Sequence, residues 1–561
     1  MPRSSAAAEN AGLAVATTTA EPLRAASKNE RRPITRHALG FYNALIMAGL
    51  YNFDLEDAEN SFDVASADSY TPALKYCIAK HPILATGIIG EETESPLFGR
   101  VSRMDLRKFV RIIEYDSVAA AGVSRGKSDE EDETEFLKRV MLTLHDRSFE
   151  NVETVPPWRV TVIPLPASST PGSEGEKRGR AYIIFSYSHS HGDGRSGLVF
   201  HRTFLRGLHG GHRIYDQSHV YTPTVASEAL PLPPPLEEAC TFTITWSYLL
   251  LSFLLTTLLG NYIPAFVKLW LKFQTPTPTT ETWTGQPIIY DPDNFRTGCE
   301  ILMVKKDRMN AILRICREKG GAKFTGLLNQ VVVRALGVVL PRHSTSPSFP
   351  SSTAGKINFI SGLVIDLRHL VPAYTDSMMV NCVSALFEQS TPCSSDKNLL
   401  KLKDDEPFWT AVRNTTTRLA ASSSTLTDQP MGLLKYLDEF RPWYLQKIGQ
   451  ERESSYEISN AVIFDPDTPI SFPEDAEDRS EAKSENKKTW DISRMIFSQP
   501  ANATNSPLSF SIVTRKNGDM VLTLTWQTGA GVLGVHDEDV FAKELLVRID
   551  GLLGEVAGGT I

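Results

Sequence analysis

The chain contains 561 residues, 41% of them hydrophobic and 22% charged, and carries a formal net charge of −8. This composition is globular, and the length favours two domains over a single core. The acidic balance and the lack of a long basic run argue against nucleic acid as the ligand, because proteins that bind phosphate backbones concentrate Lys and Arg on one face. The six cysteines are scattered without metal-ligand spacing, which indicates the buried, reduced thiols of an intracellular chain.

The chain begins with a stretch rich in Ala, Ser and Thr, residues 1–30, that has no continuous apolar run. We therefore expect this stretch to be disordered and not to be a secretory signal. A Pro-rich stretch at 230–238 precedes a long apolar segment and is the best candidate for a domain boundary. Three further regions are expected: an N-terminal lobe over 31–229, a crossover with the apolar segment over 230–285, and a C-terminal lobe over 286–561.

Helical and strand patterns alternate through both halves and predict a mixed α/β fold. The expected helices, in chain order, are Ala38–Leu50, Thr71–Lys80, Thr325–Leu340 and Asp537–Leu553. The expected strands are Lys108–Tyr115, Trp158–Ile163, Ala181–Ser188, Ile357–Leu367, Phe510–Thr514 and Met520–Trp526. Four polar stretches between these elements are predicted to be surface loops, namely 127–135, 166–179, 341–356 and 473–488.

The most informative segment is His189–Gly194 (HSHGDG), which lies between a predicted strand and a helical pattern. Its letters satisfy three different signatures. Gly192, Gly194 and Gly197 match the G-x-G-x-x-G of a dinucleotide site. Asp193, however, would place a carboxylate inside the phosphate-binding loop, where it would repel the ligand. A nucleotide site is therefore disfavoured.

The second signature is the H-x-H-x-D of metallo-β-lactamase zinc sites, through His189, His191 and Asp193. That motif continues with a further histidine where this chain has Gly194, so we expect no metal. The third signature, H-x-x-x-D-G, uses His189, Asp193 and Gly194. It needs an imidazole at a strand end, a carboxylate that fixes the backbone, and a glycine that lets the chain turn into the helix. The pattern is short, so its context has to decide.

Further segments resemble the fungal alcohol acetyltransferases and related N-acetyltransferases, a family within the chloramphenicol-acetyltransferase-like and condensation-domain superfamily. They occur in the family's order: Arg36–Asn52, which looks like an opening helix, Ala73–Ile88, Pro157–Arg159, Trp283–Gly285, Ile365–Arg368, Ser459–Asn460 and Leu522–Gly529 (LTLTWQTG). No single segment is decisive, and their joint order carries the resemblance. The chain lacks the D-F-G-W-G of the related plant acyltransferases, so the role of that element is not carried over.

The resemblance implies two similar lobes with mixed sheets flanked by helices, and a channel between them that contains His189. It implies acyl transfer from acetyl-CoA, a co-substrate and not a tightly bound cofactor, to a small hydrophobic alcohol, with a long-chain or sphingoid-like amine as the alternative acceptor. His189 would be the general base, with no acyl-enzyme. Asp193 and Gly194 would be structural, Arg368 is the expected partner of Asp193, and Asn460 is expected to line the channel.

The apolar segment is long enough for a membrane span, since residues 239–267 contain no charged side chain. Gly260–Asn261 and Pro264 interrupt it, however, and a single crossing would separate the two lobes. We therefore expect either peripheral membrane contact through 241–271 or an internal helix. The chain is expected to be a cytoplasmic monomer, peripheral on the endoplasmic reticulum or a lipid droplet if this segment meets a membrane.

Two rival functions follow from other patterns. Gly122–Gly126 fits the G-x-S-x-G of serine hydrolases, but Ser124 opens an acidic loop and not a strand-to-helix elbow. A non-catalytic, condensation-like binding protein is the stronger rival. Such a protein need not keep His189, Asp193 and Gly194, and all three are present here.

Overall fold

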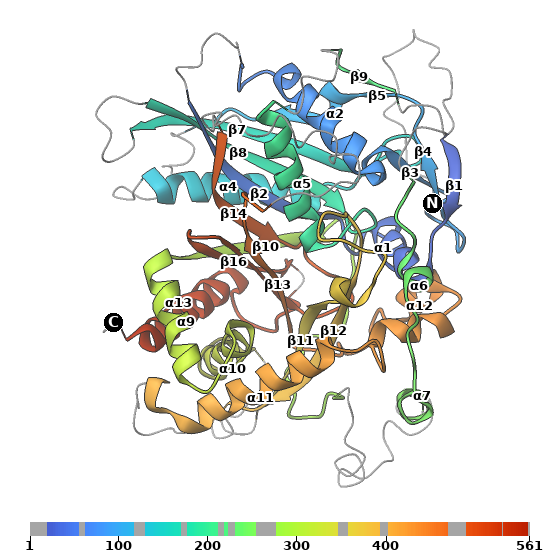
Figure 1. The fold of residues 1–561 in the computed structure, drawn as a ribbon. Coiled ribbons are helices and arrows are strands. Elements are labelled where there is room, and N and C mark those ends of the chain that lie inside the picture. The colour runs from blue at the N-terminus through green and yellow to red at the C-terminus, as the bar shows by residue number, and fades with distance from the viewer. Residues whose placement is uncertain are drawn as a thin grey trace.

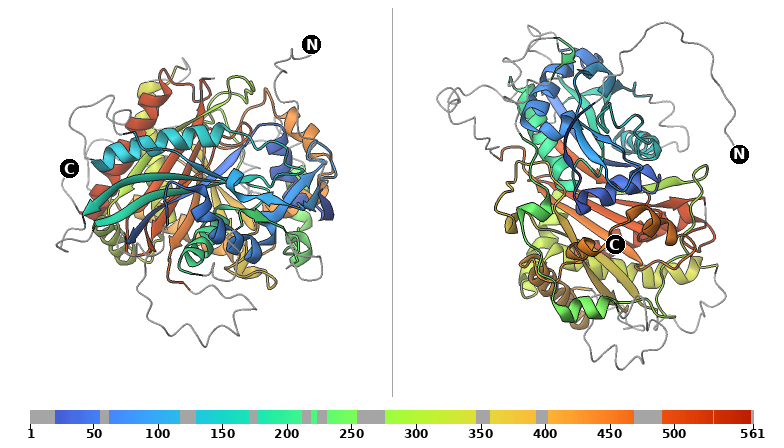
Figure 2. Two further views of the ribbon diagram at one scale, coloured as in Figure 1. Left: turned by 90° about the horizontal axis from the view of Figure 1, so that it is seen from above. Right: turned by 90° about the vertical axis from the view of Figure 1, so that its right-hand side faces the viewer.

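The computed structural model describes residues 20–54, 62–116, 129–169, 177–210, 218–222, 231–253, 276–345, 357–392, 402–468, 490–529 and 531–558. Two lobes are stacked on each other, and each is built on a sheet that helices cover (Figure 1, Figure 2). Both larger sheets mix parallel and antiparallel pairs of strands. This two-lobed, mixed α/β architecture is the fold class expected from the sequence.

The sheet of the N-terminal lobe has the strand order β14-β2-β8-β7-β6. Its strands are β2 (Ala44–Asp54), β6 (Val110–Ile112), β7 (Trp158–Ser169), β8 (Lys177–Ser188) and β14 (Trp490–Ser498). Helices α2 (Thr71–Lys80) and α5 (Gly194–Leu208) pack on one face, and α4 (Asp129–Asp146) packs on the other.

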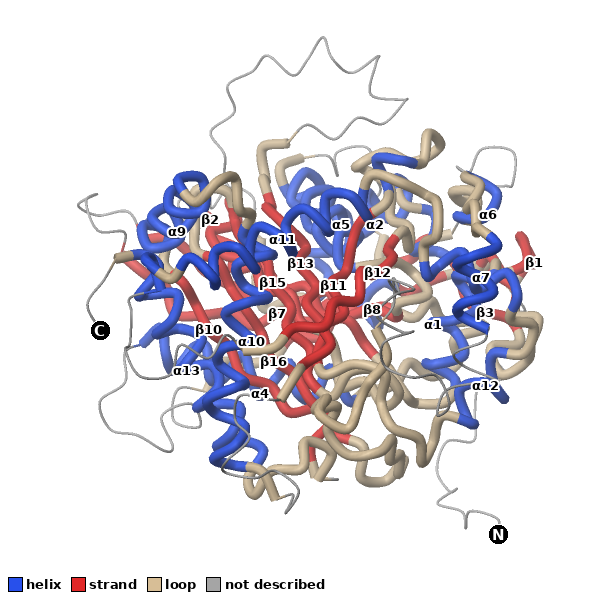
Figure 3. The backbone as a smooth tube through the Cα atoms, turned by 90° about the horizontal axis from the view of Figure 1, so that it is seen from below, coloured by secondary structure: helices blue, strands red, loops and turns tan. Residues whose placement is uncertain are grey.

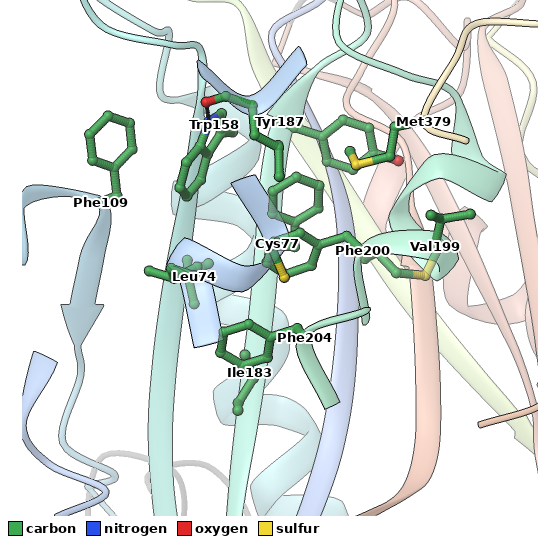
Figure 4. Close-up of a cluster of buried hydrophobic side chains, with 14 of the residues drawn as sticks. Leu74, Cys77, Phe109, Trp158, Ile183, Tyr187, Val199, Phe200, Phe204 and Met379 are labelled. Atoms are coloured by element: carbon green, nitrogen blue, oxygen red, sulfur yellow. Dashed lines mark hydrogen bonds between the residues drawn. The ribbon is translucent and has the colours of Figure 1, made fainter. Parts of the chain in front are cut away.

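Alternation along β8 explains why both faces of this sheet are apolar. Successive side chains of a strand point to opposite faces, so Ile183 joins the core under α2 and α5 while Ile184 joins the core under α4. Figure 4 shows the first of these cores, where Phe200 and Phe204 of α5 lie beside Leu74 of α2. Because β8 is buried on both faces, its end at Ser188 is held in place by the packing of the lobe.

The C-terminal lobe has a sheet with the strand order β10-β16-β15-β13-β11-β12. Its strands are β10 (Arg296–Val304), β11 (Phe359–Asp366), β12 (Val383–Ser390), β13 (Tyr456–Phe464), β15 (Leu508–Arg515) and β16 (Met520–Thr528). The helices that cover it are α9 (Lys306–Glu318), α10 (Phe324–His343), α11 (Glu406–Ser423) and α13 (Glu538–Ala557). The α10 and α13 helices contribute apolar side chains to one continuous core.

Smaller elements complete the molecule. The remaining strands are β1 (Glu21–Ala25), β3 (Thr86–Ile89), β4 (Leu97–Arg100), β5 (Met104–Asp105) and β9 (Val220–Tyr221). The remaining helices are α1 (Lys28–Ala38), α6 (Leu236–Ala239), α7 (Trp246–Phe253) and α12 (Phe440–Gln446). These four helices gather at one end of the molecule (Figure 3).

The lobe boundary does not follow the chain as simply as expected. Strand β14 belongs to the C-terminal half of the sequence, yet it pairs with β2 in the sheet of the N-terminal lobe. The range 286–561 is therefore not confined to one lobe. The expected disorder of residues 1–30 is also wrong at its end, because Glu21–Ala25 forms β1 and α1 begins at Lys28; residues 1–19 lie outside the described chain.

The predicted helix over Ala38–Leu50, part of the segment that resembles an opening helix, is wrong. Helix α1 ends at Ala38, and the apolar run that follows forms β2, which pairs with β8 on one side and β14 on the other. A strand buried on both faces is a continuous apolar run without a period of two, and such a run cannot be distinguished from a buried helix by its pattern alone. The sequence pattern therefore did not show that β2 is a central strand of the sheet.

Three predicted loops and one strand also need correction. The acidic stretch at 127–135 is helical from Asp129, where carboxylates favour a helix N-terminus. Of the stretch 166–179, residues up to Ser169 belong to β7 and residues from Lys177 belong to β8. Of the stretch 341–356, residues up to His343 belong to α10. The strand expected over Lys108–Tyr115 is reduced to β6. The loop at 473–488 lies outside the described residues.

Among the described residues, one helix is long and apolar enough to cross a membrane, and that helix is α10. About two-thirds of its apolar window is buried (67%), and its side chains fill the core of the C-terminal lobe. It is therefore a core helix. Of the apolar segment over 241–271, the structure describes α7, whose Trp246 is 84% exposed, while residues 254–275 lie outside the described chain.

Candidate active site

The HSHGDG segment connects the end of β8 to the start of α5. Asp193 is the N-cap of α5: its Oδ1 accepts a hydrogen bond from the Ser196 N–H at 3.1 Å, and Ser196 Oγ accepts one from the Asp193 N–H at 3.2 Å. This reciprocal pair satisfies donors that a helix start would otherwise leave free. The Tyr187 hydroxyl donates to the Asp193 carbonyl oxygen at 2.7 Å. The expected strand, turn and helix are confirmed.

The two glycines of the turn stand where a side chain would not fit. A Cβ on Gly192 would lie 2.4 Å from the Cβ of Ser196. A Cβ on Gly194 would lie 2.8 Å from the ring of Phe497, which comes from β14. Gly194 does not have a left-handed φ, so the expected reason for it, a sharp turn into the helix, is wrong. The glycine instead lets β14 pack closely against the first turn of α5.

The Asp193 carboxylate points away from the turn and bonds to the C-terminal lobe. Arg368 Nη2 donates to Asp193 Oδ1 at 2.7 Å, and the Cys382 N–H donates to Oδ2 at 3.0 Å. Arg368 also donates to Asp366 Oδ1 at 2.9 Å and to the Val380 carbonyl at 2.8 Å. The predicted pairing of Arg368 with Asp193 is therefore confirmed, and it ties the turn to the other lobe.

The electrostatics of this pair follow from its burial. The side chains of Arg368 and Asp193 are only 3% and 2% exposed. Burial alone would raise the pKa of Asp193, but the charge of Arg368 and the hydrogen bonds from Arg368, Cys382 and Ser196 hold this pKa below its ordinary value. The two carboxylates beside Arg368 raise the pKa of its guanidinium. Both members of the pair are therefore charged.

His189 directly follows β8 and is partly exposed. Its ring centroid lies 5.9 Å from that of Tyr42, and its Nδ1 atom has no hydrogen-bond partner in the described part of the chain. Burial lowers the pKa of His189 below its ordinary value of 6.5, and the positive charges of Arg36 and Arg32 lower it further. The imidazole is therefore neutral at neutral pH, which is the form that can accept a proton.

A polar chain continues from Tyr42 across the two lobes. The Tyr42 hydroxyl donates to Gln499 Oε1 at 2.8 Å, and Gln499 Nε2 donates to Glu457 Oε1 at 3.0 Å. Burial raises the pKa of Glu457. Sequence reasoning did not find Tyr42, Gln499 or Glu457, because no local motif contains them. The only signal was that Tyr42 lies within the resemblance segment that also contains Arg36.

The geometry does not support the zinc signature. His191 Nε2 lies 3.0 Å from the Thr86 carbonyl oxygen, and Asp193 faces Arg368, so the two do not converge with His189. The described residues contain no group of three or more His, Cys, Asp or Glu placed to hold a metal. Ser124 of the hydrolase pattern lies outside the described residues.

Asn460 lies on β13, where its Nδ2 donates to Thr325 Oγ1 at 3.1 Å and its Oδ1 accepts from the Val462 N–H at 2.9 Å. Val462 has a φ of +63°, and the pairing of β13 with β15 is irregular between Asn460 and Ile463. Asn460 therefore stabilises a local irregularity of the strand. Its place in a channel stays a prediction.

Two surface cavities of about 410 and 400 Å³ are present. The first is lined by residues of β6, β7 and α4, and the second by residues of β12, α11 and Tyr248. His189 lines neither of them, so the expected channel between the lobes also stays a prediction.

The two-lobed fold carries an H-x-x-x-D-G turn, and the pair of Asp193 with Arg368 ties this turn to the other lobe. Residues 58–532 match the model of the alcohol acetyltransferase family. This match spans most of the chain, and the protein belongs to that family. At the level of the family, its activity is acetyl transfer.

Relatives with similar sequences come from fungi. The chain is 23% identical over 518 residues to the "Probable alcohol acetyltransferase FCK4" of Fusarium pseudograminearum, with 90% of this chain and 91% of that protein covered. It is 23% identical over 508 residues to the "Probable alcohol acetyltransferase crmB" of Aspergillus fumigatus, with 88% and 92% covered. The solved TRI3 trichothecene 15-O-acetyltransferase of Fusarium sporotrichioides has the same fold, with a TM-score of 0.59, 13% identity and coverage of 95% and 94%.

Proposed function

We propose that the protein transfers an acetyl group from acetyl-CoA to the hydroxyl group of an alcohol, with His189 as the general base. The observation that carries this proposal is a neutral, partly exposed imidazole on a turn that Asp193 ties to the other lobe. Asp193, Gly194 and Arg368 hold this geometry, and they have no contact with the reacting groups in the proposal.

In the proposed reaction, His189 accepts the proton of the acceptor hydroxyl as its oxygen attacks the thioester carbonyl carbon. The carbon–sulfur bond then breaks, and the departing thiolate takes the proton back from His189. The products are the acetate ester and the free thiol of CoA. Activation of the hydroxyl is the harder task, because a thiol with a pKa of about 8.5 is a good leaving group.

Direct transfer without an acyl-enzyme is supported by the state of the cysteines. Burial raises the pKa of each of the five described cysteines, Cys77, Cys240, Cys299, Cys316 and Cys382. A thiolate nucleophile needs the opposite shift. None of these cysteines is therefore suited to form a thioester intermediate.

The proposal is tested by replacing His189 with Ala and measuring thiol release from acetyl-CoA with a panel of medium-chain alcohols. We expect kcat/KM to fall by about 10²–10⁴-fold, the usual contribution of a general base. The matched control is His369→Ala, the same chemical change at an exposed residue, which is expected to keep the wild-type rate.

Two results would count against the proposal. Thiol release that survives in His189→Ala would show that another group is the base. A folded wild-type protein that binds acetyl-CoA but acetylates no acceptor would favour the non-catalytic, condensation-like alternative.

A further inference from the structure

Helix α1 carries two arginines on one face, close to the proposed base. Arg32 and Arg36 are four residues apart, so their side chains lie on the same side of the helix. The Arg36 guanidinium carbon lies 4.5 Å from the centroid of the Tyr42 ring, and that ring is the one that contacts His189. Arg36 is only 4% exposed. Two cationic groups therefore lie near the imidazole, close enough for both charges to act on it.

Neither arginine is neutralised by a carboxylate. In the described part of the chain, neither guanidinium has an ion pair or a side-chain hydrogen bond, and the Nε atoms of both are buried without a partner. Glu457 is the carboxylate whose charge reaches both arginines, but it accepts its hydrogen bond from Gln499. The local charge is therefore positive.

This arrangement is unfavourable without a ligand. A guanidinium taken out of water needs partners for its N–H groups, and like charges four residues apart on a helix repel each other. Two features offset part of the cost: the cation–π contact with Tyr42, and the position of Arg36 in the last turn of α1, where the helix dipole favours a cation. Neither feature satisfies the N–H donors, which remain available to bind an acceptor atom.

Other buried arginines of the structure are satisfied in ways that Arg36 is not. Arg368 has two carboxylates, and Arg334 donates to Asp405 at 2.8 Å. Arg452 is also buried without a carboxylate, but its Nη1 donates to the carbonyl oxygens of Ala503 and Asn505 at 2.7 and 2.8 Å. Nε atoms without a partner also occur on Arg368 and Arg452. What distinguishes Arg32 and Arg36 is that neither guanidinium makes any hydrogen bond or ion pair within the described residues.

We propose that Arg32 and Arg36 form a subsite for a carboxylate that the acceptor alcohol carries, so that the natural acceptor is a hydroxy acid. This inference rests on the proposed function and deepens it by naming the class of acceptor. Arginine suits the task because its planar N–H groups match both oxygens of a carboxylate. The phosphates of acetyl-CoA are a poor alternative, because the long, neutral pantetheine arm separates them from the thioester at His189.

The same subsite bears on the choice between alcohol and amine acceptors. A protonated amine would meet two positive charges beside the base, so the cationic pair disfavours the binding of a sphingoid-like amine. A bound carboxylate, in contrast, would offset the two charges that lower the pKa of His189. The acceptor that fits the subsite is thus also the one that makes His189 a stronger base.

The test compares para-hydroxymethylbenzoate with its methyl ester, two acceptors of the same body that differ in charge. In the wild-type protein, kcat/KM for the acid is expected to exceed that for the ester by about tenfold or more, as a charged hydrogen bond provides. In Arg36→Met and in Arg32→Met the ratio of acid to ester is expected to fall toward one, mainly through KM. Arg314→Met, a change at an exposed arginine of α9, is the matched control and should keep the wild-type ratio.

A second measurement separates this inference from the proposed function. Binding of para-hydroxymethylbenzoate is measured by calorimetry in His189→Ala, which needs no turnover, and is expected to weaken by about tenfold when Arg36→Met is added. If wild-type protein acetylates neither acceptor but this arginine-dependent binding is present, the proposed function fails and the subsite stands. If binding is absent or independent of both arginines, the subsite is wrong.

Three kinetic results would also overturn the subsite. The first is a wild-type ratio of acid to ester near one. The second is an equal loss with acid and ester in both arginine variants, which would assign the arginines to the general architecture. The third is a preference for succinyl-CoA over acetyl-CoA without any preference among acceptors, which would place the anion on the acyl group instead.

Discussion

Arg368 and Arg36 are both buried beside the same turn, and they differ in what surrounds them. Arg368, in the C-terminal lobe, bonds to Asp193, Asp366 and a backbone carbonyl oxygen. Arg36, on α1, has an aromatic ring and no carboxylate within ion-pair distance in the described chain. An arginine paired with carboxylates serves the scaffold, whereas one without any such partner has donors left for a ligand. The comparison therefore distinguishes Arg368, whose charge stabilises the fold, from Arg36, whose charge is available to bind a ligand.

The largest expected effect is on Arg368, the arginine that is paired with carboxylates. Arg368→Met leaves the Asp193 carboxylate buried without its cation, so we expect the free energy of unfolding to fall by about 3–5 kcal/mol. Chemical denaturation followed by fluorescence measures this change. The exposed pair of Arg314 with Glu318 is the reference, since Arg314→Met should alter stability by no more than about 0.5 kcal/mol. Equal stability of the two variants would show that the Asp193 pair is not a scaffold.

A much smaller effect is expected when the same substitution is made at Arg36, which has no carboxylate partner in the described residues. Arg36→Met removes a buried charge and its repulsion with Arg32, and it loses the contact with Tyr42. These contributions oppose each other, so we expect the free energy of unfolding to change by less than about 1 kcal/mol. The same denaturation experiment measures it. A loss as large as that of Arg368→Met would mean that Arg36 is structural and would remove the contrast.

The smallest expected effect is that of pH on the free enzyme. The pKa of His189 is lowered by burial and by Arg36 and Arg32, so the imidazole stays neutral as pH falls through 6.5. With a neutral alcohol as acceptor, kcat/KM is therefore expected to be flat between about pH 6 and 8. An inflection near 6.5 in the pH profile would contradict this. In Arg36→Met the pKa of His189 should rise, which would bring the inflection closer to this range.

The segment around the proposed base could be read from the sequence because its structure is local. The alternating pattern of Ala181–Ser188 predicts a strand, the spacing after Gly194 predicts a helix, and the turn between them needs small and capping residues. The pairing of Asp193 with Arg368, 175 residues away, came from the resemblance to a family. The residue pattern alone contains no information on a partner so distant.

Which residues become neighbours depends on the packed structure. The mixed α/β class and the residues of the HSHGDG turn follow from the sequence, because alternation, helical spacing and turn chemistry act over a few residues. The sequence did not show that β2 is a central strand, that β14 crosses into the other lobe, or that Arg36 lies over the ring beside His189. Those placements depend on how whole sheets and helices pack, and the energies that select them belong to contacts between residues far apart in the chain.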